Sequence, residues 1–599
     1  MFSTLSQRLS SFTYLNATQF LGALNDNIYK LLIVYFFIQL EGIEYSHQIL
    51  ASTGATFVIP FLLFSAGSGI LADRFSKRDI IVFTKILELL IMGISVVAFA
   101  FHSKWGSYSV LFLLATQSAI FGPSKYGIVP ELVGTDKISK ANGMMTSFTF
   151  LAIILGTFLA SFLIQITGRN FIMCAIFCTF IALVGLVTSF MIEHTPPAGS
   201  NKKLKWFFLS EIYNSLKLAH KEISLLPAMF GSAFFLFVGA FTQLNIIPYA
   251  VTSLHLSDIQ GGYLFFLTAI GIGSGALIAG KISGKIVELG LVPIGALGIS
   301  ICAFSLDIFS NYFYAVLPLV TILGVFGGIY EIPLDSYIQV ASPKKSRGQM
   351  VAATNFMSFI GVLIASALIY LNSEVFGIEA NQGFGLMGIF SVLVMIAFTF
   401  QFFDYLTRFI GAILAKLHFT TLFKGKENVP ECPAIYVCTH TAWNDTLLLL
   451  GSQRRRMRFF IEHEQSHNSS WTRQLYKMLR VVFIPDIAPL EKNKACQEAI
   501  QKALQKGISV CIFIRSWDIY SEVEKLHQSS PFNEIIEVAN YPIIPVQIEK
   551  GIKESKFKLF KSVVKKFRVP ASVAFGNMIY TGHQSLLQTR HEHELCFDE

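Results

Sequence analysis

His440 and Asp445 are separated by four residues and carry the side chains that a general base requires. They follow the apolar run 434–438, which is expected to be a strand, and precede the apolar run 446–450, which is expected to be a buried helix. A carboxylate beside a histidine can hold the imidazole in the tautomer whose free nitrogen accepts a proton from a hydroxyl. The same spacing also arises by chance, so the rest of the chain must decide whether this pair is catalytic.

A second set of chemically active residues lies inside long apolar segments. Asp26 stands in the middle of the first segment, where a carboxylate costs roughly 2.5–3.5 kcal/mol unless it is paired or hydrated. Lys30 follows one helical turn later, so an ion pair between the two is geometrically available. Further polar residues lie near prolines of the fourth and tenth segments. A zwitterionic head group needs one cationic and one anionic contact, and these residues together with Asp26 and Lys30 can provide both. The candidate substrate-binding residues are Asn25, Asp26, Asn27, Lys30, Lys125, Tyr126, Glu131 and Asp335.

Two of these assignments have an alternative. Asp26 and Lys30 can instead form a structural ion pair that closes one end of a transporter. Glu88, in the third apolar segment, is assigned to packing or to an interface and not to ligand binding.

The composition is that of a polytopic membrane protein with a more polar remainder. The chain has 599 residues, of which 53% are hydrophobic and only 14% are charged, against about 25% charged in soluble domains. The net charge of +9 does not indicate nucleic-acid binding, because Lys and Arg fall mostly in short loops between apolar segments. The eight cysteines show no spacing typical of a metal site or a disulfide framework, so no metal and no resident cofactor is expected. No cleavable signal peptide is expected either.

Twelve apolar segments are long enough to cross a hydrocarbon core of ~30 Å. The first six lie near 14–38, 47–72, 80–101, 106–132, 140–165 and 170–192, and the second six lie near 226–252, 259–280, 291–310, 313–341, 350–372 and 382–407. Basic residues concentrate in alternate loops, which predicts that both termini are cytoplasmic in a multi-pass membrane protein.

The two sets of six segments repeat one another. The tripeptide Gly-Ser-Gly at 67–69 recurs at 273–275, and the segment 139–144 recurs in similar form at 346–350, in both cases with an offset of about 206 residues. Parallel repeats of six spans place a substrate site between the two halves, near the middle of the membrane. Coincidence among glycine- and serine-rich helices is the alternative, and the shared offset argues against it.

The expected fold class is an all-α polytopic membrane protein of twelve transmembrane helices plus a C-terminal cytoplasmic α/β domain. The two six-helix halves are residues 1–192 and 226–407, and residues 193–225 form a cytoplasmic central loop with an amphipathic helix. Residues 408–423 are expected to be an interfacial linker helix. Residues 424–599 form the α/β domain, with strands expected at 434–438, 457–461, 481–484, 509–514 and 542–548 and helices at 445–452, 469–479 and 493–506.

The membrane half resembles a known transporter family. Residues 69–78, Gly-Ile-Leu-Ala-Asp-Arg-Phe-Ser-Lys-Arg, resemble the loop 2–3 signature of the major facilitator superfamily. This implies that superfamily's fold and a gating element made of Gly69, Asp73, Arg74 and Arg78, in which the aspartate and the arginines can pair across the halves. The segments 20–27, 121–132, 140–144 and 332–339 resemble its bacterial lysophospholipid transporter branch. That resemblance covers about residues 10–405 and implies flipping of lysophosphatidylethanolamine and lysophosphatidylglycerol to the cytoplasmic leaflet.

The C-terminal part, with His440 and Asp445 as its first motif, resembles the glycerolipid acyltransferases of the 2-acylglycerophosphoethanolamine acyltransferase type. Segments 456–461, 483–486 and 541–546 resemble the blocks that follow. The resemblance implies that His440 acts as base on the lysolipid hydroxyl, that Asp445 orients it, and that acyl-acyl carrier protein or acyl-CoA is the co-substrate. The third motif departs from the family pattern, because Arg515 and Ser516 stand where the family has glutamate and glycine. Arg515 can bind the acceptor phosphate, or it can mark a domain that has lost activity.

The sequence therefore predicts a lysophospholipid flippase coupled to re-acylation by a fused acyltransferase domain. The expected partners are the lysophospholipid, membrane lipids, and either acyl carrier protein or a separate acyl-activating synthetase, with no nucleic acid. The first alternative is a major facilitator transporter of another amphiphile or drug with a non-catalytic docking module. The second is a scaffold that anchors an acyl-activating enzyme.

Overall fold

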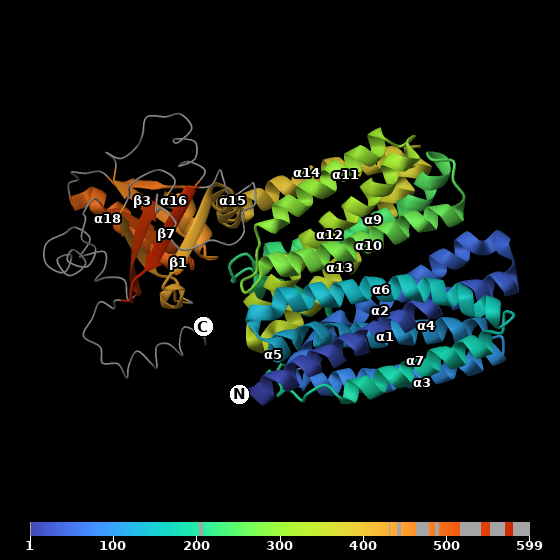
Figure 1. Ribbon diagram of the computed structural model, residues 1–599. Helices are drawn as coiled ribbons and strands as arrows, with labels where there is room; N and C mark the ends of the chain where they lie inside the picture. The colour runs from blue at the N-terminus through green and yellow to red at the C-terminus, as the bar shows by residue number, and fades with distance from the viewer. Residues whose placement is uncertain are drawn as a thin grey trace, which may run out of the picture. The chain divides into compact units, whose positions relative to one another are not determined.

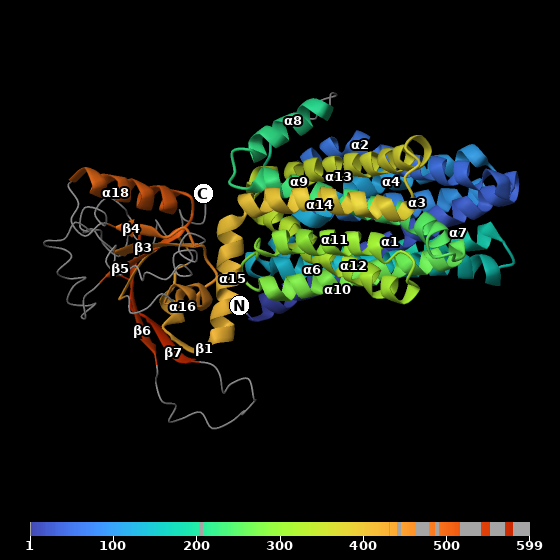
Figure 2. The ribbon, with the colours of Figure 1, turned by 90° about the horizontal axis from the view of Figure 1, so that it is seen from above.

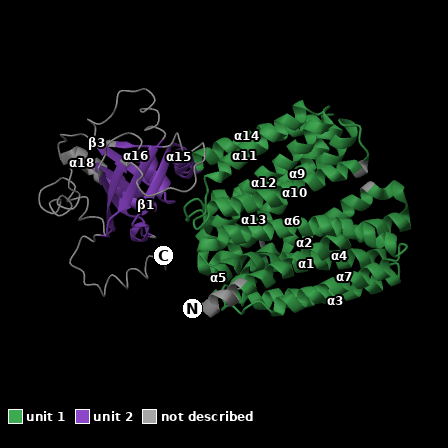
Figure 3. Cartoon of the chain, in the orientation of Figure 1, with its two compact units in different colours: residues 1–401 green, residues 402–599 purple. Residues whose placement is uncertain are grey.

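The computed structural model describes residues 2–202, 208–430, 432–439, 445–462, 479–484, 490–514, 541–550 and 569–578. The chain divides into two compact units, residues 1–401 and residues 402–599 (Figure 3). Three of the predicted site residues, His440, Arg515 and Ser516, lie outside the described residues.

The first unit is a bundle of long helices (Figure 1). The first half contains α1 (Phe2–Glu41), α2 (Ser46–Arg74), α3 (Lys77–Ala100), α4 (Lys104–Gly127), α6 (Ile138–Ile166) and α7 (Phe171–Phe190). The second half contains α9 (Leu225–Thr252), α10 (Asp258–Ser283), α11 (Leu291–Ile308), α12 (Phe313–Ala341), α13 (Arg347–Tyr370) and α14 (Ala380–Gln401). Shorter helical segments connect them: η1 (Ile43–Tyr45), α5 (Val129–Val133), η2 (Thr135–Lys137), α8 (Phe208–Ala219), η3 (Lys344–Ser346) and η4 (Leu371–Val375).

Among the described residues, eleven helices are long and apolar enough to cross a membrane. The twelfth long helix, α4, has 24 residues and packs against α2 and α3. A helix satisfies its own backbone hydrogen bonds, which is why long apolar runs adopt it in a bilayer. Ser76, Ser103 and Asn170 cap α3, α4 and α7, each by accepting a hydrogen bond from a first-turn N–H. The predicted fold class, two halves of six helices, is confirmed.

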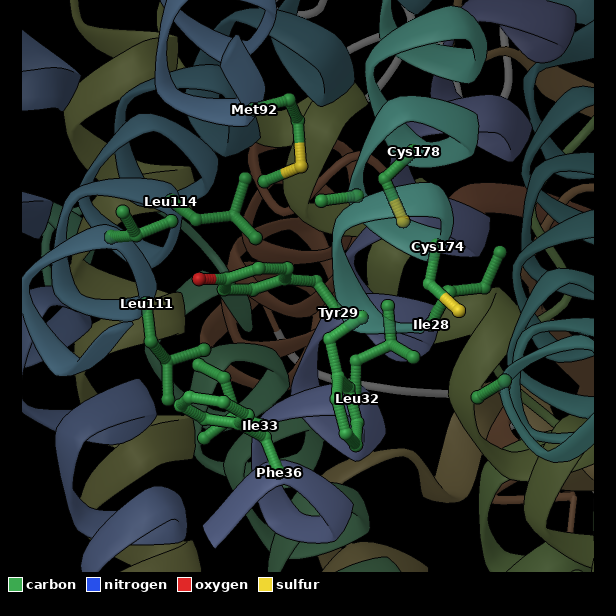
Figure 4. Close-up of a cluster of buried hydrophobic side chains, with 14 of the residues drawn as sticks. Ile28, Tyr29, Leu32, Ile33, Phe36, Met92, Leu111, Leu114, Cys174 and Cys178 are labelled. Atoms are coloured by element: carbon green, nitrogen blue, oxygen red, sulfur yellow. The ribbon is translucent and has the colours of Figure 1, made fainter. Parts of the chain in front are cut away.

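A cluster of buried apolar side chains in the first half contains two cysteines (Figure 4). Tyr29 of α1 is completely buried there, among side chains of α3, α4 and α7. Cys174 and Cys178 of α7 are also completely buried and are free thiols. They pack as small hydrophobic residues in this interior.

Two pairs of helices join the halves by close glycine contacts. At the first joint, α2 meets α13, and a Cβ atom added to Gly69 or to Gly348 would come within 2.8 Å of the other residue's carbonyl oxygen. At the second joint, α6 meets α10, and the Ser147 hydroxyl donates to the Gly273 carbonyl at 2.6 Å. The first joint therefore pairs the 67–69 segment with the 346–350 region. The second joint pairs the 273–275 segment with α6, next to the 139–144 region. This arrangement agrees with the predicted repeat.

The second unit is built on a seven-stranded sheet with the strand order β1-β7-β6-β2-β5-β3-β4. Its strands are β1 (Phe419–Lys424), β2 (Ile435–Thr439), β3 (Met457–Glu462), β4 (Val482–Ile484), β5 (Ser509–Ile514), β6 (Ile543–Lys550) and β7 (Val569–Phe575). All neighbouring strands are parallel except β6 and β7. The five predicted strands are present, whereas β1 and β7 were not predicted.

Helices cover both faces of this sheet (Figure 2). The leucines of α16 (Asp445–Ser452) pack on one face, and Ile500, Ala503 and Leu504 of α18 (Leu490–Gln505) pack on the other. The expected helix at 469–479 falls almost entirely outside the described residues. A turn, η5 (Lys426–Asn428), follows β1.

The linker helix differs from the expected range 408–423. The last long helix of the first unit ends at Gln401, and α15 covers Phe403–His418. The remaining residues, 419–424, form edge strand β1, which pairs with β7. A pairing partner more than a hundred residues later draws this segment into the sheet, and no local pattern shows it.

Candidate functional site

A cavity of about 250 Å³ whose wall combines apolar side chains with several polar ones lies between the two halves of the first unit. Its wall comes from α4, α6, α9, α12 and α13. The acidic side chains of Glu331 and Asp335 line it, and both belong to α12. The hydroxyl of Ser232 on α9 donates to Glu331 Oε1 at 2.6 Å. Of the eight predicted substrate-binding residues, Tyr126 and Asp335 line this cavity.

Lys125 supplies positive charge near the cavity. Its ammonium lies 4.5 Å from the centroid of the Tyr126 ring and 5.8 Å from that of Phe121. It is within electrostatic range of Asp335 on one side and of Asp26 on the other. This lysine therefore stands between the cavity and the charged residues of α1 and α3.

Asp26 and Asn25 belong to a polar cluster buried inside the first half. The Ser118 hydroxyl of α4 donates to Asp26 Oδ2 at 2.8 Å. Asn25 Nδ2 donates to Glu88 Oε1 at 3.2 Å, and Lys85 Nζ contacts Glu88 Oε2 at 2.5 Å. The prediction that Glu88 serves only packing or an interface missed this cluster. Its sequence signal was present, because Lys85 and Glu88 are three residues apart in a long apolar segment.

Three predicted substrate-binding residues have other partners. Lys30 places its ammonium 5.3 Å from the Phe57 ring centroid, and the described residues show no ion pair between Lys30 and Asp26. Asn27 donates to the Ala23 carbonyl of its own helix at 2.7 Å. The carboxylate of Glu131 pairs with Lys77 at 2.6 Å, at the end of the bundle that carries the 69–78 segment, and Glu131 does not line the cavity described above.

Asp73 of the 69–78 segment connects the halves, but through backbone groups of the opposite half and not through arginines. Its carboxylate accepts hydrogen bonds from the Gly348 N–H at 2.7 Å and from the Gln349 N–H at 3.0 Å. These N–H groups belong to the first turn of α13, where a carboxylate also interacts favourably with the helix dipole. Arg78 donates instead to the carbonyls of Phe190 and Ile192 within its own half. Arg74 lies over the ring of Phe75.

The central segment between the halves is tied to the same joint. Lys202 Nζ donates to Gln349 Oε1 at 2.8 Å and pairs with Glu211 of α8 at 2.5 Å. Gln349 in turn donates from its side-chain amide to Asp73 at 3.0 Å. Because α8 also packs against α2 and α13, the central segment contributes to the closed joint and is more than a connector.

Replacing Asp73 with alanine is expected to open this joint. Loss of a capping carboxylate costs about 1 kcal/mol, which is roughly a fivefold shift toward the open arrangement. A cysteine introduced at Ser139 in the second joint, in a chain whose own cysteines are replaced, should then react about fivefold faster with a membrane-impermeant maleimide. Asp79→Ala is the matched control, because the Asp79 carboxylate pairs with Arg78 and His194 of its own half. An unchanged labelling rate for Asp73→Ala would contradict the gating role.

In the second unit, the predicted motif segments adjoin the neighbouring strands β2, β5 and β6 in the chain. Asp445 is completely buried as the first residue of α16, directly after the segment that follows β2. Thr439 at the end of β2 and Ile514 at the end of β5 are registered partners, and they precede His440 and Arg515 in the chain. The 541–546 segment leads into β6 on the other side of β2, where Ile435 pairs with Ile543. The carboxyl ends of these parallel strands therefore form one edge.

A nearby thiol is not a competing nucleophile. Burial raises the pKa of Cys511 well above its usual value, and the neighbouring Cys438 and Asp445 add to this effect. Cys511 therefore stays protonated at neutral pH, and a protonated thiol is a poor nucleophile.

Arginines gather around the first turn of α15, at the other end of β3. Arg456 stacks over the Tyr405 ring at 4.6 Å, while Arg458 and Arg480 pair with Asp404 at 3.5 and 3.2 Å. Burial, with a smaller contribution from the positive charge of Arg454, lowers the pKa of Arg408 from its usual value to about 10. Arg454, Arg455 and Arg456 precede β3 and therefore lie at the end of the sheet opposite the motif edge.

Family models match both units. The Major Facilitator Superfamily model matches residues 15–366 and 229–410, about two thirds of the chain. The chain belongs to the major facilitator superfamily. The Acyltransferase model matches residues 421–549, so the second unit contains an acyltransferase domain.

Relatives and solved structures agree with this family. The chain is 26% identical over 383 residues to the lysophospholipid transporter LplT of Klebsiella pneumoniae subsp. pneumoniae, covering 63% of this chain and 92% of the relative. It is 28% identical over 397 residues to LplT of Citrobacter koseri, covering 64% and 94%. The first unit has the fold of the E. coli fucose:proton symporter FucP (TM-score 0.55, 13% identity, 65% of this chain and 98% of that chain). The human organic anion transporter MFSD10 gives the same TM-score, at 13% identity over 65% of this chain and 99% of that chain.

Proposed function

We propose that this major facilitator protein moves lysophosphatidylethanolamine and lysophosphatidylglycerol to the cytoplasmic leaflet and that its acyltransferase domain re-acylates them there. The observation that carries the transport proposal is the cavity between the halves. Asp335, one of the two acids of α12 in its wall, lies within electrostatic range of Lys125, so both signs of charge meet at this cavity. A zwitterionic head group such as phosphoethanolamine needs contacts of both signs, whereas the anionic phosphoglycerol head group needs the cationic contact. Relatives that are lysophospholipid transporters support this substrate class.

The acyl transfer can be written with the residues of the acyltransferase domain. His440 takes the proton from the free hydroxyl of the lysolipid, and the hydroxyl oxygen attacks the carbonyl carbon of an acyl thioester. The new ester bond forms, the carbon–sulfur bond breaks, and the thiol of acyl carrier protein or coenzyme A leaves with the proton. Asp445 holds the imidazole in the tautomer that this reaction requires.

The proposed location is the bacterial inner membrane, with both termini on the cytoplasmic side. Basic residues in the alternate loops support this orientation. Helix α15 presents Ile413 and Leu417 to the outside, next to Lys416, which suits a helix at the membrane surface. The acyltransferase domain and the release of the lysolipid would then be on the same side of the membrane.

One observation favours a second candidate function. Arg515 and Ser516 replace the glutamate and glycine of the family's third motif. A domain without that acid can be a docking module on a transporter of another amphiphile, with no acyl transfer. A competition assay that compares lysolipids with unrelated amphiphiles separates the two candidates, because only a lysolipid transporter is inhibited selectively by lysolipids.

The main test uses spheroplasts that lack their own lysophospholipid transporter and acyltransferase. Cells that express this chain should take up radiolabelled lysophosphatidylethanolamine and convert it to the diacyl lipid. The absence of lysolipid uptake in cells with a verified amount of protein in the membrane would refute the transport proposal.

In the same assay, Asp26→Asn should reduce the initial uptake rate by about tenfold. The substitution removes a charge that accepts a hydrogen bond from Ser118 and interacts with Lys85, Lys125 and Glu88, and hydrogen bonds to charged groups contribute roughly 1.5–3 kcal/mol. Glu44→Gln, an exposed acid in the loop after α1, is the control and should leave uptake unchanged. Wild-type uptake by Asp26→Asn would remove this residue from the mechanism.

A further inference from the structure

Another pocket, of about 630 Å³, opens at the C-terminal end of α6. Its wall comes from the last turns of α1, the last turns of α6 and the turn that leads into α7. Ser139, in the joint with α10, lies at the other end of the same helix, and a rise of 1.5 Å per residue puts roughly 39 Å between it and Gln165 of the pocket. With both termini cytoplasmic, as proposed above, the pocket is on the outer side of the membrane.

The pocket carries positive charge and hydrogen-bond donors. Arg169 lines it together with the amide side chains of Gln39 and Gln165, and none of its lining residues is acidic. The described residues show no ion pair to Arg169, whereas Lys104, at the same end of the bundle, pairs with Glu41. A guanidinium whose charge is not neutralised, placed beside amide donors, suits an anion.

The backbone holds Arg169 in a defined place. Gly168 and Arg169 have φ angles of 61° and 63°, a left-handed conformation that is uncommon for a residue other than glycine. The Arg169 N–H donates to the Ile164 carbonyl at 2.8 Å and the Gly168 N–H donates to the Gln165 carbonyl at 3.3 Å, which is the Schellman pattern of a helix end. Asn170 then caps α7. The cation of the pocket is therefore fixed between the ends of two helices.

One face of α6 leads from this pocket to the cavity between the halves. Its residues recur at every third or fourth position, the first three lining the cavity and the last three lining the pocket: Thr146, Phe150, Ile153, Thr157, Ser161, Ile164 and Gly168. Thr157 and Ser161 are exposed, so polar groups are accessible between the two sites. A different face of α6 carries exposed apolar residues, which suits contact with lipid: Leu151, Leu155, Phe158, Phe162 and Ile166.

We infer that Arg169, Gln39 and Gln165 form an entry subsite for the phosphate of a lysolipid that arrives from the outer leaflet. The guanidinium pairs with the phosphodiester monoanion, and the two amides donate to its oxygens. The lysolipid then follows the accessible face of α6 to the cavity. Both proposed substrates carry this phosphate, so the subsite serves both of them. This inference rests on the proposed transport function.

The first test compares variants in the uptake of lysophosphatidylethanolamine by spheroplasts. Arg169→Gln should raise KM about fivefold and leave kcat within about twofold of wild type, because it removes one charge-assisted contact made on entry. Gln165→Leu, which keeps the cation, should raise KM about threefold. Lys104→Gln is the matched control, because this cation lies at the same end of the bundle and does not line the pocket. An unchanged KM in Arg169→Gln, with normal wild-type uptake, would overturn the subsite alone.

The second test changes the charge of the ligand. Wild-type protein should take up the phosphodiester with higher kcat/KM than its methyl phosphotriester, which has the same acyl chain and a neutral phosphate. Arg169→Gln should lose about fivefold of that preference. A purely structural role for Arg169 at the end of α6 would lower uptake of both lipids equally, so a preference that survives in Arg169→Gln contradicts the inference.

A third arm identifies the source of the phosphate. Glycerophosphoethanolamine, the same head group without an acyl chain, should inhibit uptake at least about a hundredfold more weakly than a competing lysolipid, because only the lipid is concentrated in the leaflet beside the pocket. Equal inhibition would show that the pocket binds soluble phosphate esters and that the lipid assignment is wrong. If the wild-type protein takes up no lysolipid of any kind, the proposed function fails, and the entry subsite fails with it.

Discussion

Replacing His440 with alanine is expected to lower the rate of acyl transfer to lysophosphatidylethanolamine by roughly a hundredfold to ten-thousandfold, the usual contribution of a positioned general base. Lysolipid uptake by the same cells should stay at the wild-type level, because transport uses the first unit. The scaffold around the motif supports this expectation. Thr439 ends a fully paired central strand, and Asp445 is buried at the start of α16.

The measurement is the conversion of radiolabelled lysolipid to diacyl lipid by membranes supplied with acyl thioester. Asp445→Asn should lose activity as well, since it keeps the shape of the side chain and removes the negative charge that fixes the imidazole tautomer. His418→Ala is the control, because this histidine is exposed at the end of α15. If wild-type membranes form no diacyl product, the domain does not catalyse this acyl transfer. The second candidate function, a transporter with a non-catalytic docking module, is then favoured.

The second large effect is expected from Gly69→Val, which should reduce lysolipid uptake to less than about one tenth of wild type. A Cβ at this position would stand 2.6 Å from Ala352 Cβ and 2.9 Å from Gln349 Cα. Relieving such overlap moves α2 away from α13, and overpacking of this kind costs roughly 1–3 kcal/mol. The movement also weakens the hydrogen bonds from the first turn of α13 to Asp73. An alternating transporter that cannot close this joint cannot complete its cycle.

Gly54→Val is the matched control on the same helix, because a Cβ at Gly54 has no neighbour within 4 Å. Its uptake should equal that of the wild type. The maleimide labelling of a cysteine at Ser139 should increase in Gly69→Val and not in Gly54→Val. Normal uptake by Gly69→Val would show that the α2–α13 contact is not part of the transport cycle.

Sequence reasoning identified the helical bundle because its signals are local. A run of twenty or more apolar residues must be helical in a bilayer, whatever lies elsewhere in the chain. The repeated Gly-Ser-Gly segments also carried information, since small residues at a fixed offset mark places where two helices approach closely. The expected strands of the second unit were likewise visible as short apolar runs between helical patterns.

Local sequence patterns could not predict the hydrogen-bond and ion-pair partners of the charged residues. Lys30 is four residues from Asp26, yet it lies over Phe57, while Asp26 accepts a hydrogen bond from Ser118 on α4. Glu131 pairs with a lysine 54 residues away and belongs to the gating end instead of the cavity. Helix rotation determines these contacts, and rotation depends on packing against several neighbours at once.

The sequence by itself thus determined which segments span the membrane, where the halves repeat, and which motif of the second unit can act as a base. Only the tertiary structure decided that Asp73 caps a helix 275 residues later, that Lys85 and Glu88 join Asp26 in a buried cluster, and that Glu331 and Asp335 line the cavity between the halves. The physical reason is the same in each case. Hydrophobic length and periodicity act within one segment, whereas a buried polar group is satisfied by whichever partner the packing of distant segments brings within about 3 Å.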